Sequence, residues 1–167
     1  MAILREDLLA GRAVVLSGAR AAVREQLVAL GAVVVEGGGD AADAVVHDAG
    51  IELGGAQALM SALEETWAVV AEVANGSLIP SGRGGKVVLI APAEDAGDEF
   101  VAAARAALEN LARTLSIEWA RYGITAVAIA PAAAARDEDV ALLIAYLVSR
   151  AGDYFSGCRF ELAFRSG

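Results

Sequence analysis

The chain has 167 residues, enough for one compact domain with a sizeable core, and we expect a single domain over residues 1–167. Hydrophobic residues make up 57% of the sequence, yet no apolar stretch is long enough to span a bilayer, which takes roughly 18–20 residues. The formal net charge is −9, and Lys and Arg are not clustered along the sequence, which argues against a nucleic-acid-binding protein.

The single cysteine, Cys158, excludes an internal disulfide and is typical of a reducing compartment. The first seven residues lack the basic-then-apolar order of a signal peptide. We therefore expect a cytoplasmic protein. The high apolar content also favours an oligomer, because the excess apolar surface must be buried inside the fold or against another subunit.

Short β-rich runs alternate with helical stretches along the chain, which is the pattern of an α/β fold. Most of the strand candidates are near-continuous apolar runs, as expected for parallel strands covered on both faces. We expect a doubly wound parallel sheet of about six strands in three α/β/α layers. The predicted strands are Ala13–Ser17, Ala32–Val35, Ala44–His47, Lys86–Ala91, Thr125–Ala130 and Cys158–Ala163, and the predicted helices lie near residues 20–30, 55–75, 98–121 and 137–149.

The helices near 55–75 and 98–121 are apolar on more than one side, because apolar residues recur at spacings of three and four along two adjacent lines. Such a helix packs on the sheet and on something else, so we expect the outer faces to contact a partner subunit. The alternative is that both helices are simply core. The pair Asn75-Gly76 predicts the end of the first of them. The predicted interface residues are Leu63, Trp67, Val70, Leu108, Leu111, Leu115 and Trp119.

One connection is unusually short. Only eight residues, 36–43, join the second predicted strand to the third, whereas a crossover between parallel strands normally needs about a dozen or more. The run Gly37-Gly38-Gly39 makes an extended connection feasible. We expect that part of the usual crossover is absent here.

Four segments of the chain resemble the short-chain dehydrogenase/reductase family. The strongest runs from Val101 to Pro131 without a gap and resembles the family's catalytic helix and the following strand. The others stand in place of the family's Asn-Asn-Ala-Gly segment, its strand leading to the catalytic serine, and its C-terminal segment. These three are His47-Asp48-Ala49-Gly50, Gly84–Ile90 and Tyr154-Phe155-Ser156-Gly157. The resemblance implies a Rossmann-like fold in a shortened and degenerate member of the family.

Members of this family transfer hydride with a nicotinamide cofactor, using a Tyr-x-x-x-Lys pair and an upstream Ser. The resemblance places Val101 at the Tyr position, Arg105 at the Lys position, and Ala91 or Pro92 at the Ser position. None of these side chains replaces the missing chemistry, so we predict no catalytic residue. We expect Arg105 to be a solvated arginine on the helix surface, because its planar guanidinium is no substitute for a compact ammonium.

The family's cofactor loop, Thr-Gly-x-x-x-Gly-x-Gly, falls on Ser17-Gly18, with Ala22 and Arg24 where the later glycines belong. Glu36 follows the second strand, where NAD-binding relatives hold a ribose, and we expect a solvated loop carboxylate. We therefore predict no cofactor-binding residue. We expect a structural role for His47, the only histidine, and a helix-capping role for the acids at 137–139. No metal site is predicted.

The expected function is that of a non-catalytic subunit, which forms an oligomer with itself or with a full-length dehydrogenase, without nucleic acid or membrane. Two alternatives remain open. One is an NAD- or NADP-dependent oxidoreductase with atypical catalytic residues. The other is a small-molecule binding module that uses the cleft at the carboxyl ends of the strands.

Overall fold

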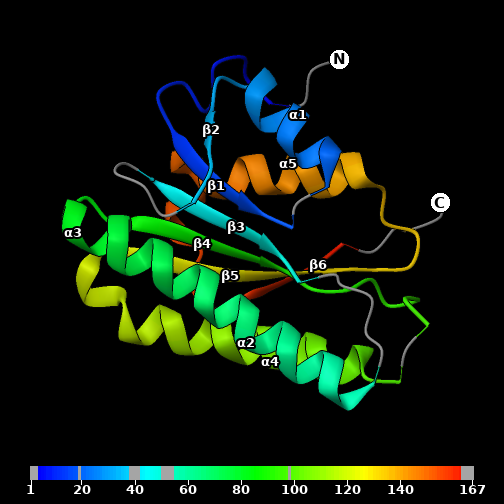
Figure 1. The fold of residues 1–167 in the computed structure, drawn as a ribbon. Helices are drawn as coiled ribbons and strands as arrows, with labels where there is room; N and C mark the ends of the chain where they lie inside the picture. The colour runs from blue at the N-terminus through cyan, green and yellow to red at the C-terminus, as the bar shows by residue number, and fades with distance from the viewer. Residues whose placement is uncertain (1–3, 19, 38–41, 50–54, 98, 163–167) are drawn as a thin grey trace.

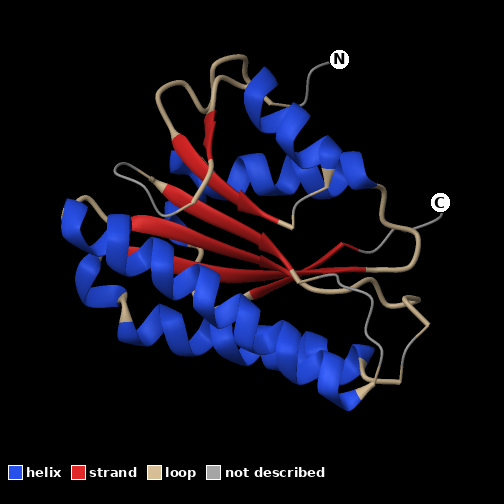
Figure 2. Cartoon of the chain, in the orientation of Figure 1, coloured by secondary structure: helices blue, strands red, loops and turns tan. Residues whose placement is uncertain are grey.

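The computed structural model describes residues 4–18, 20–37, 42–49, 55–97 and 99–162. Within these ranges, six parallel strands form one sheet in the order β2-β1-β3-β4-β5-β6 (Figure 1). Helices cover both faces of the sheet and produce three layers, with α1 and α5 on one face and α2 and α4 on the other (Figure 2). The predicted doubly wound α/β architecture is confirmed.

The strands agree with the predicted ranges to within one residue at each end, although Ala163 lies outside the described residues. The strands are β1 (Ala13–Ser17), β2 (Val33–Val35), β3 (Ala44–Asp48), β4 (Gly85–Ile90), β5 (Ile124–Pro131) and β6 (Arg159–Leu162). The α-helices are α1 (Ala21–Ala29), α2 (Ala56–Val73), α3 (Ile79–Ser81), α4 (Val101–Glu118) and α5 (Asp137–Val148). Short 3₁₀ turns follow α4 and α5 at Ala120–Tyr122 and Arg150–Tyr154. No helix in these described ranges is long and apolar enough to cross a membrane.

Burial of the sheet on both faces explains the apolar strands. Alternate residues of each strand face opposite helical layers. Val46 and Val88 pack with α1 and α5, whereas Val45 and Val87 pack with α2 and α4. Every residue of β3 is buried, so neither of its faces tolerates a solvated polar side chain.

The short connection between β2 and β3 is possible because β2 is short. Val35, the last residue of β2, pairs with Val15 of β1, and Ala44, the first residue of β3, pairs with Val14. The end of β2 and the start of β3 therefore lie only one residue apart along the direction of β1. The chain then has to cross β1, a lateral distance of about 10 Å, and eight extended residues reach about 26 Å. Ala42 is buried against the α2 and α4 layer, and its N–H donates to Ser77 Oγ at 2.7 Å. Gly38 and Gly39 lie outside the described residues.

The helix that contains Asn75-Gly76 does not end there, so that prediction is wrong. After Val73 the chain makes one wider π-helical turn over Ala74–Leu78 and continues into α3. The side-chain amide of Asn75 donates a hydrogen bond to the carbonyl of Ala71 at 2.8 Å, so this helix carbonyl has a donor within the same helical segment. Gly82, with φ of +63°, ends the segment in the left-handed conformation.

Gly84 and Gly82 provide a matched test of close backbone packing, because both have φ values in the left-handed region. A Cβ at Gly84 would lie 2.5 Å from the carbonyl oxygen of Gly123, whereas a Cβ at Gly82 would meet nothing within 4 Å. We expect Gly82→Ala to lower the free energy of unfolding by about 1 kcal/mol. Gly84→Ala should lower it by about 3 kcal/mol or more, since the backbone must also move. Urea denaturation measures both, and equal losses would contradict this account.

Candidate functional site

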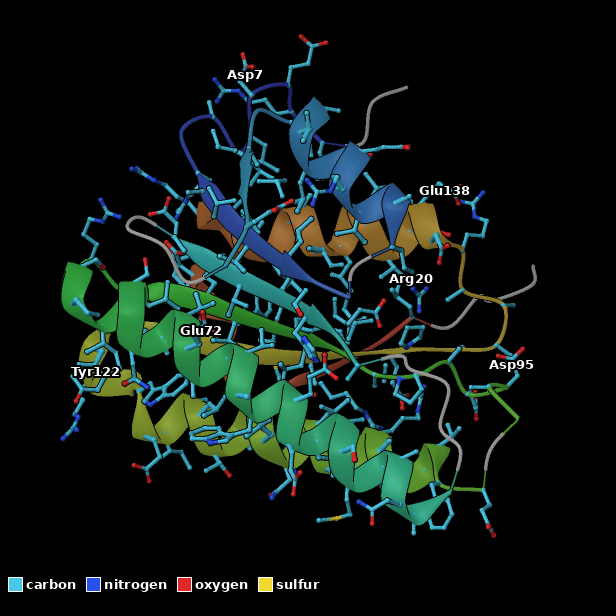
Figure 3. The ribbon with its side chains drawn as sticks, viewed as in Figure 1. Asp7, Arg20, Glu72, Asp95, Tyr122 and Glu138 are labelled. Atoms are coloured by element: carbon cyan, nitrogen blue, oxygen red, sulfur yellow. The ribbon has the colours of Figure 1, made fainter. Side chains whose placement is uncertain are left out.

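Arg20 bridges two carboxylates at the carboxyl edge of the sheet. The chain leaves β1 toward β2, and β3 lies on the other side of β1, so this is the switch point of the strand order, where dinucleotides bind in open α/β sheets. Arg20 immediately precedes α1, at the helix N-terminus that would face a pyrophosphate. Its Nε lies 3.1 Å from Asp48 Oδ2, at the end of β3, and its Nη1 lies 2.5 Å from Asp137 Oδ1, at the start of α5. Figure 3 shows Arg20 at this edge, near the start of α5.

The bridge neutralises a buried charge. The Asp48 side chain is only 5% exposed, so an unpaired carboxylate there would be costly. Burial lowers the pKa of Arg20, but the charges and hydrogen bonds of Asp48 and Asp137 outweigh it and raise this pKa above the ordinary value. Arg20 is therefore charged at every physiological pH. A pyrophosphate at this helix N-terminus would have to approach both carboxylates and compete with them for the guanidinium.

The loop between β1 and α1 is too short for a glycine-rich cofactor loop. Only residues 18–20 separate the two elements, and Ala22 and Arg24, at the positions of the later family glycines, lie inside α1. Gly18 has φ of +64°, and a Cβ there would lie 2.7 Å from the Asp48 carbonyl oxygen. Gly18 thus lets the end of β1 approach the end of β3 closely. Glu36 is exposed, as expected.

The positions that the resemblance identified as catalytic are apolar or structural. Val101 begins α4 and is buried, as are Ala91 and Pro92 after β4. The expectation for Arg105 is wrong: its Nη1 donates to the carbonyls of Pro92, at 2.8 Å, and Pro131, at 2.7 Å. Arg105 therefore ties the end of β5 to the segment that follows β4, where the Pro131 carbonyl also accepts the N–H of Glu94 at 3.3 Å.

A hollow of about 380 Å³ lies beside these positions. Glu94, Glu99 and Arg159 line it together with Val101 and Arg105. Arg159 forms ion pairs with two carboxylates: its Nη1 lies 2.6 Å from Glu109 Oε2, and its Nη2 lies 2.5 Å from Glu161 Oε1. Among the described residues, no histidine, tyrosine, cysteine or lysine lines this hollow; the acids that line it are Glu94 and Glu99, and neither stands where the resemblance places the family's tyrosine.

His47 lies in β3 and is 1% exposed. Neither ring nitrogen has a hydrogen-bond partner within the described part of the chain. Ser17 is its register neighbour on β1 but makes no hydrogen bond with it, so no nucleophile–base pair forms. Burial lowers the pKa of His47, and the charges of Glu65 and Asp48 oppose only part of this effect. The burial of His47 and the absence of a hydrogen-bonded nucleophile among the described residues favour the expected structural role.

The acids at the start of α5 lie in its first turn, as expected for stabilisation through the helix dipole, although they make no cap hydrogen bond. The N-cap position is Arg136, and no side chain makes a cap hydrogen bond there. Asp137 reaches Arg20, and Asp139 pairs with Arg136 at 2.8 Å. Across the ranges that the structure describes, no three potential ligands gather into a metal site.

The predicted interface residues divide into two groups. Val70, Leu108 and Leu115 belong to the core beneath α2 and α4, at 0–3% exposure, so the chain itself covers them and they cannot meet a partner directly. Trp67 is 50% exposed and stacks on Trp119, with ring centroids 6.3 Å apart. The side chains that remain accessible on this surface are Leu63, Trp67, Leu111 and Trp119.

The Arg20 bridge was not predicted from the sequence. Its members are 28 and 117 residues apart, and no local pattern connects Arg20 with Asp48 or Asp137. The available signal was a basic residue directly before the first helix, together with an acid that ends an otherwise apolar strand. A charge at the end of a doubly covered strand implies a partner.

His47 should make folding sensitive to mild acid. The folded state binds its proton less readily than the unfolded chain, so its contribution to stability is complete above the unfolded pKa of about 6.5 and is lost as the pH falls below it. The loss reaches at most about 1.4 kcal/mol per pH unit for one proton. His47 is the only histidine, so His47→Leu should nearly remove the change in unfolding free energy between neutral pH and mild acid. Urea denaturation at several pH values tests this, and an equal pH dependence in both proteins would contradict it.

No family model matches the sequence, and no curated protein matches it. Solved structures do match. A citronellol catabolism dehydrogenase from Pseudomonas aeruginosa aligns with a TM-score of 0.77 and 21% identity, over 96% of each chain. A short-chain dehydrogenase from Mycobacterium smegmatis aligns with a TM-score of 0.73 and 19% identity, over 97% of this chain and 96% of that one. BdcA from Escherichia coli aligns at 0.74 and 21%, over 93% and 100%. The predicted resemblance is confirmed at the level of architecture: the chain has the short-chain dehydrogenase/reductase fold.

Proposed function

We propose that this chain is a non-catalytic subunit with the short-chain dehydrogenase/reductase fold, which assembles through α2 and α4 with a second copy or with a full-length dehydrogenase. The observation that carries the proposal is the Arg20 bridge. Its guanidinium and the carboxylates of Asp48 and Asp137 meet at the α1 N-terminus, where a dinucleotide would place its pyrophosphate. The positive charge at this helix N-terminus is thus already paired with two carboxylates of the protein itself.

The former catalytic positions support the same proposal. Valine has no proton to transfer, so Val101 cannot act as the general acid or base. Arg105 keeps a positive charge, but its Nη1 is engaged by two backbone carbonyls, and freeing it would leave both without this donor. A hydride transfer would therefore need both a new acid and a new way to orient the cofactor.

The outer surface of α2 and α4 supports the assembly. On this surface, Met60 is 53% exposed and Ile117 is 75% exposed, in addition to Trp67 at 50%. Exposed tryptophan, methionine and isoleucine in two adjacent 18-residue helices form a surface suited to protein contact. We define this as the α2/α4 face, consisting of Met60, Leu63, Trp67, Leu111, Ile117 and Trp119.

The cofactor part of the proposal predicts that the purified chain does not bind NADH or NADPH. The shortened loop and the two carboxylates of the bridge oppose the pyrophosphate of either cofactor. Isothermal titration calorimetry up to millimolar cofactor should show no saturable heat. Saturable binding would favour the alternative function, an oxidoreductase with atypical catalytic residues.

The assembly part predicts that a charge on the α2/α4 face weakens self-association. We expect Ile117→Glu and Trp67→Glu each to raise the dissociation constant at least about tenfold, because an unpaired carboxylate would be buried on assembly. Val28→Glu is the matched control, since Val28 is 54% exposed but lies on α1, on the opposite side of the sheet. Sedimentation velocity over a range of concentrations measures all four proteins.

An equal effect of the α1 control and the two test variants would contradict assembly through this face. A wild-type chain that stays monomeric alone, and that also fails to join a full-length dehydrogenase of the same cell on co-purification, would overturn the assembly proposal. Far-ultraviolet circular dichroism shows whether each variant is folded, because all three substituted side chains are at least half exposed.

A further inference from the structure

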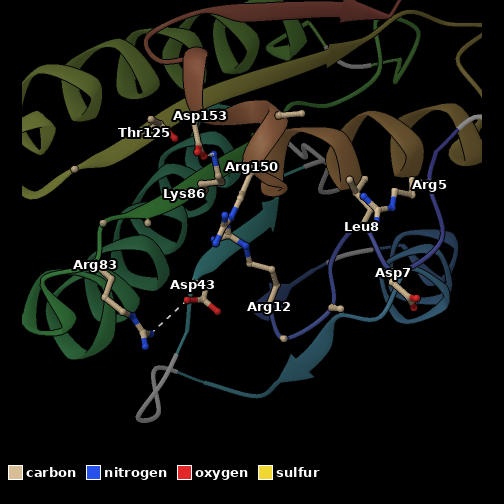
Figure 4. A pocket seen from close by; sticks show the side chains of 16 residues that line it. Arg5, Asp7, Leu8, Arg12, Asp43, Arg83, Lys86, Thr125, Arg150 and Asp153 are labelled. Carbon is tan, nitrogen blue, oxygen red and sulfur yellow. Dashed lines mark hydrogen bonds and ion pairs between the residues drawn. The ribbon is translucent and has the colours of Figure 1, made fainter.

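A second cavity lies at the amino edge of the sheet, opposite the Arg20 bridge. It has a volume of about 760 Å³, within the usual range for small-molecule sites. The residues before β1, the starts of β4 and β5, and the turn after α5 form its walls, as Figure 4 shows. None of these elements contributes to the Arg20 bridge at the carboxyl edge, so the cavity is independent of the proposed assembly and of the former cofactor site.

The cavity gathers positive charge in an acidic protein. Among the described residues, five basic side chains line it, against three carboxylates from Asp7, Asp43 and Asp153, whereas the whole chain has 13 basic and 22 acidic residues. The local excess is therefore positive, although the formal net charge of the chain is −9. The basic residues are Arg5, Arg12, Arg83, Lys86 and Arg150.

Two of the carboxylates are already engaged. Asp153 lies 2.6 Å from the Nζ of Lys86, whose side chain is only 5% exposed. Asp43 accepts the N–H of Ala13 at 2.9 Å and pairs with Arg83 at 3.3 Å. These contacts fix the walls of the cavity and use the carboxylates that would otherwise neutralise the remaining cations.

Arg12 and Arg150 remain without a carboxylate partner among the described residues. Both line the cavity, and in Figure 4 their guanidinium groups point toward one another between Lys86 and Asp43. Two like charges that converge in a concave site repel each other unless an anion lies between them. A guanidinium group can donate two parallel hydrogen bonds to the oxygens of a phosphate, which is bidentate binding. Two such guanidinium groups in one cavity therefore suit a phosphate ligand.

The lining also limits the kind of ligand. No aromatic side chain of the described residues lines the cavity, so a nucleobase would find no ring there on which to stack. Leu8 is the one large apolar residue that the described part of the chain contributes to the wall, and Thr125 adds a hydroxyl that can donate. We propose that this cavity binds a compact small molecule that carries two or more phosphate groups and no aromatic ring.

Inorganic triphosphate is the first probe, because it supplies the charge of such a ligand without any other group. We expect saturable binding by isothermal titration calorimetry and a higher midpoint of thermal unfolding with the probe present. The double variant Arg12→Gln/Arg150→Gln should weaken binding at least about tenfold, since it removes both guanidinium groups that have no carboxylate partner among the described residues.

The matched control is Arg24→Gln/Arg121→Gln, which removes the same charge from exposed positions outside the cavity. We expect the control to bind triphosphate as the wild type does. The absence of saturable binding at millimolar triphosphate would overturn the proposal, as would an equal loss in both double variants. Tighter binding of a single-stranded oligonucleotide than of triphosphate, lost in the same variant, would show that the surface recognises nucleic acid, and would also overturn it.

Discussion

The burial of the central strands on both faces is the constraint on which the rest of the structure depends. A residue in β3, β4 or β5 has a helical layer above or below it, so a polar side chain there must find a partner or remain unsatisfied. Three buried exceptions occur in these strands: His47, Asp48 and Lys86. Asp48 ends β3 and Lys86 lies near the start of β4, and each finds its ionic partner beyond the sheet edge. His47, further inside, remains without one in the described part of the chain.

The same constraint explains how much of the fold could be predicted from the sequence. Doubly covered strands produce short apolar runs, and all six were located to within one residue. The continuation of the helix beyond α2 was missed, because the glycine of Asn75-Gly76 was interpreted as a helix end, whereas a π-helical turn over Ala74–Leu78 includes it and leads into α3. The short connection to β3 was identified as unusual, but its explanation needed the register of β2, which no sequence pattern contains.

The sites were harder to predict than the fold, because their residues are far apart in the chain. Arg105 was expected in solvent, yet the two carbonyls that it binds lie 13 and 26 residues away, at strand ends whose position depends on the whole sheet. The interface prediction included Val70, Leu108 and Leu115, because an apolar line on a helix does not reveal which of its sides meets the sheet. The basic residues of the amino-edge cavity come from three separate parts of the sequence, so the chain showed no cationic cluster until it folded.

The two edges of the sheet differ in what their positive charges can still do. At the carboxyl edge, Arg20 is held by two carboxylates and Arg105 by two carbonyls, so neither guanidinium is available without the loss of an existing bond. At the amino edge, the walls are fixed by their own ion pairs, while Arg12 and Arg150 have no carboxylate partner among the described residues. An anion gains most where positive charge is concentrated but not yet neutralised. Among the described residues that condition is met at the amino edge, opposite the Arg20 bridge, so the short loop between β1 and α1 does not argue against a phosphate site elsewhere on the fold.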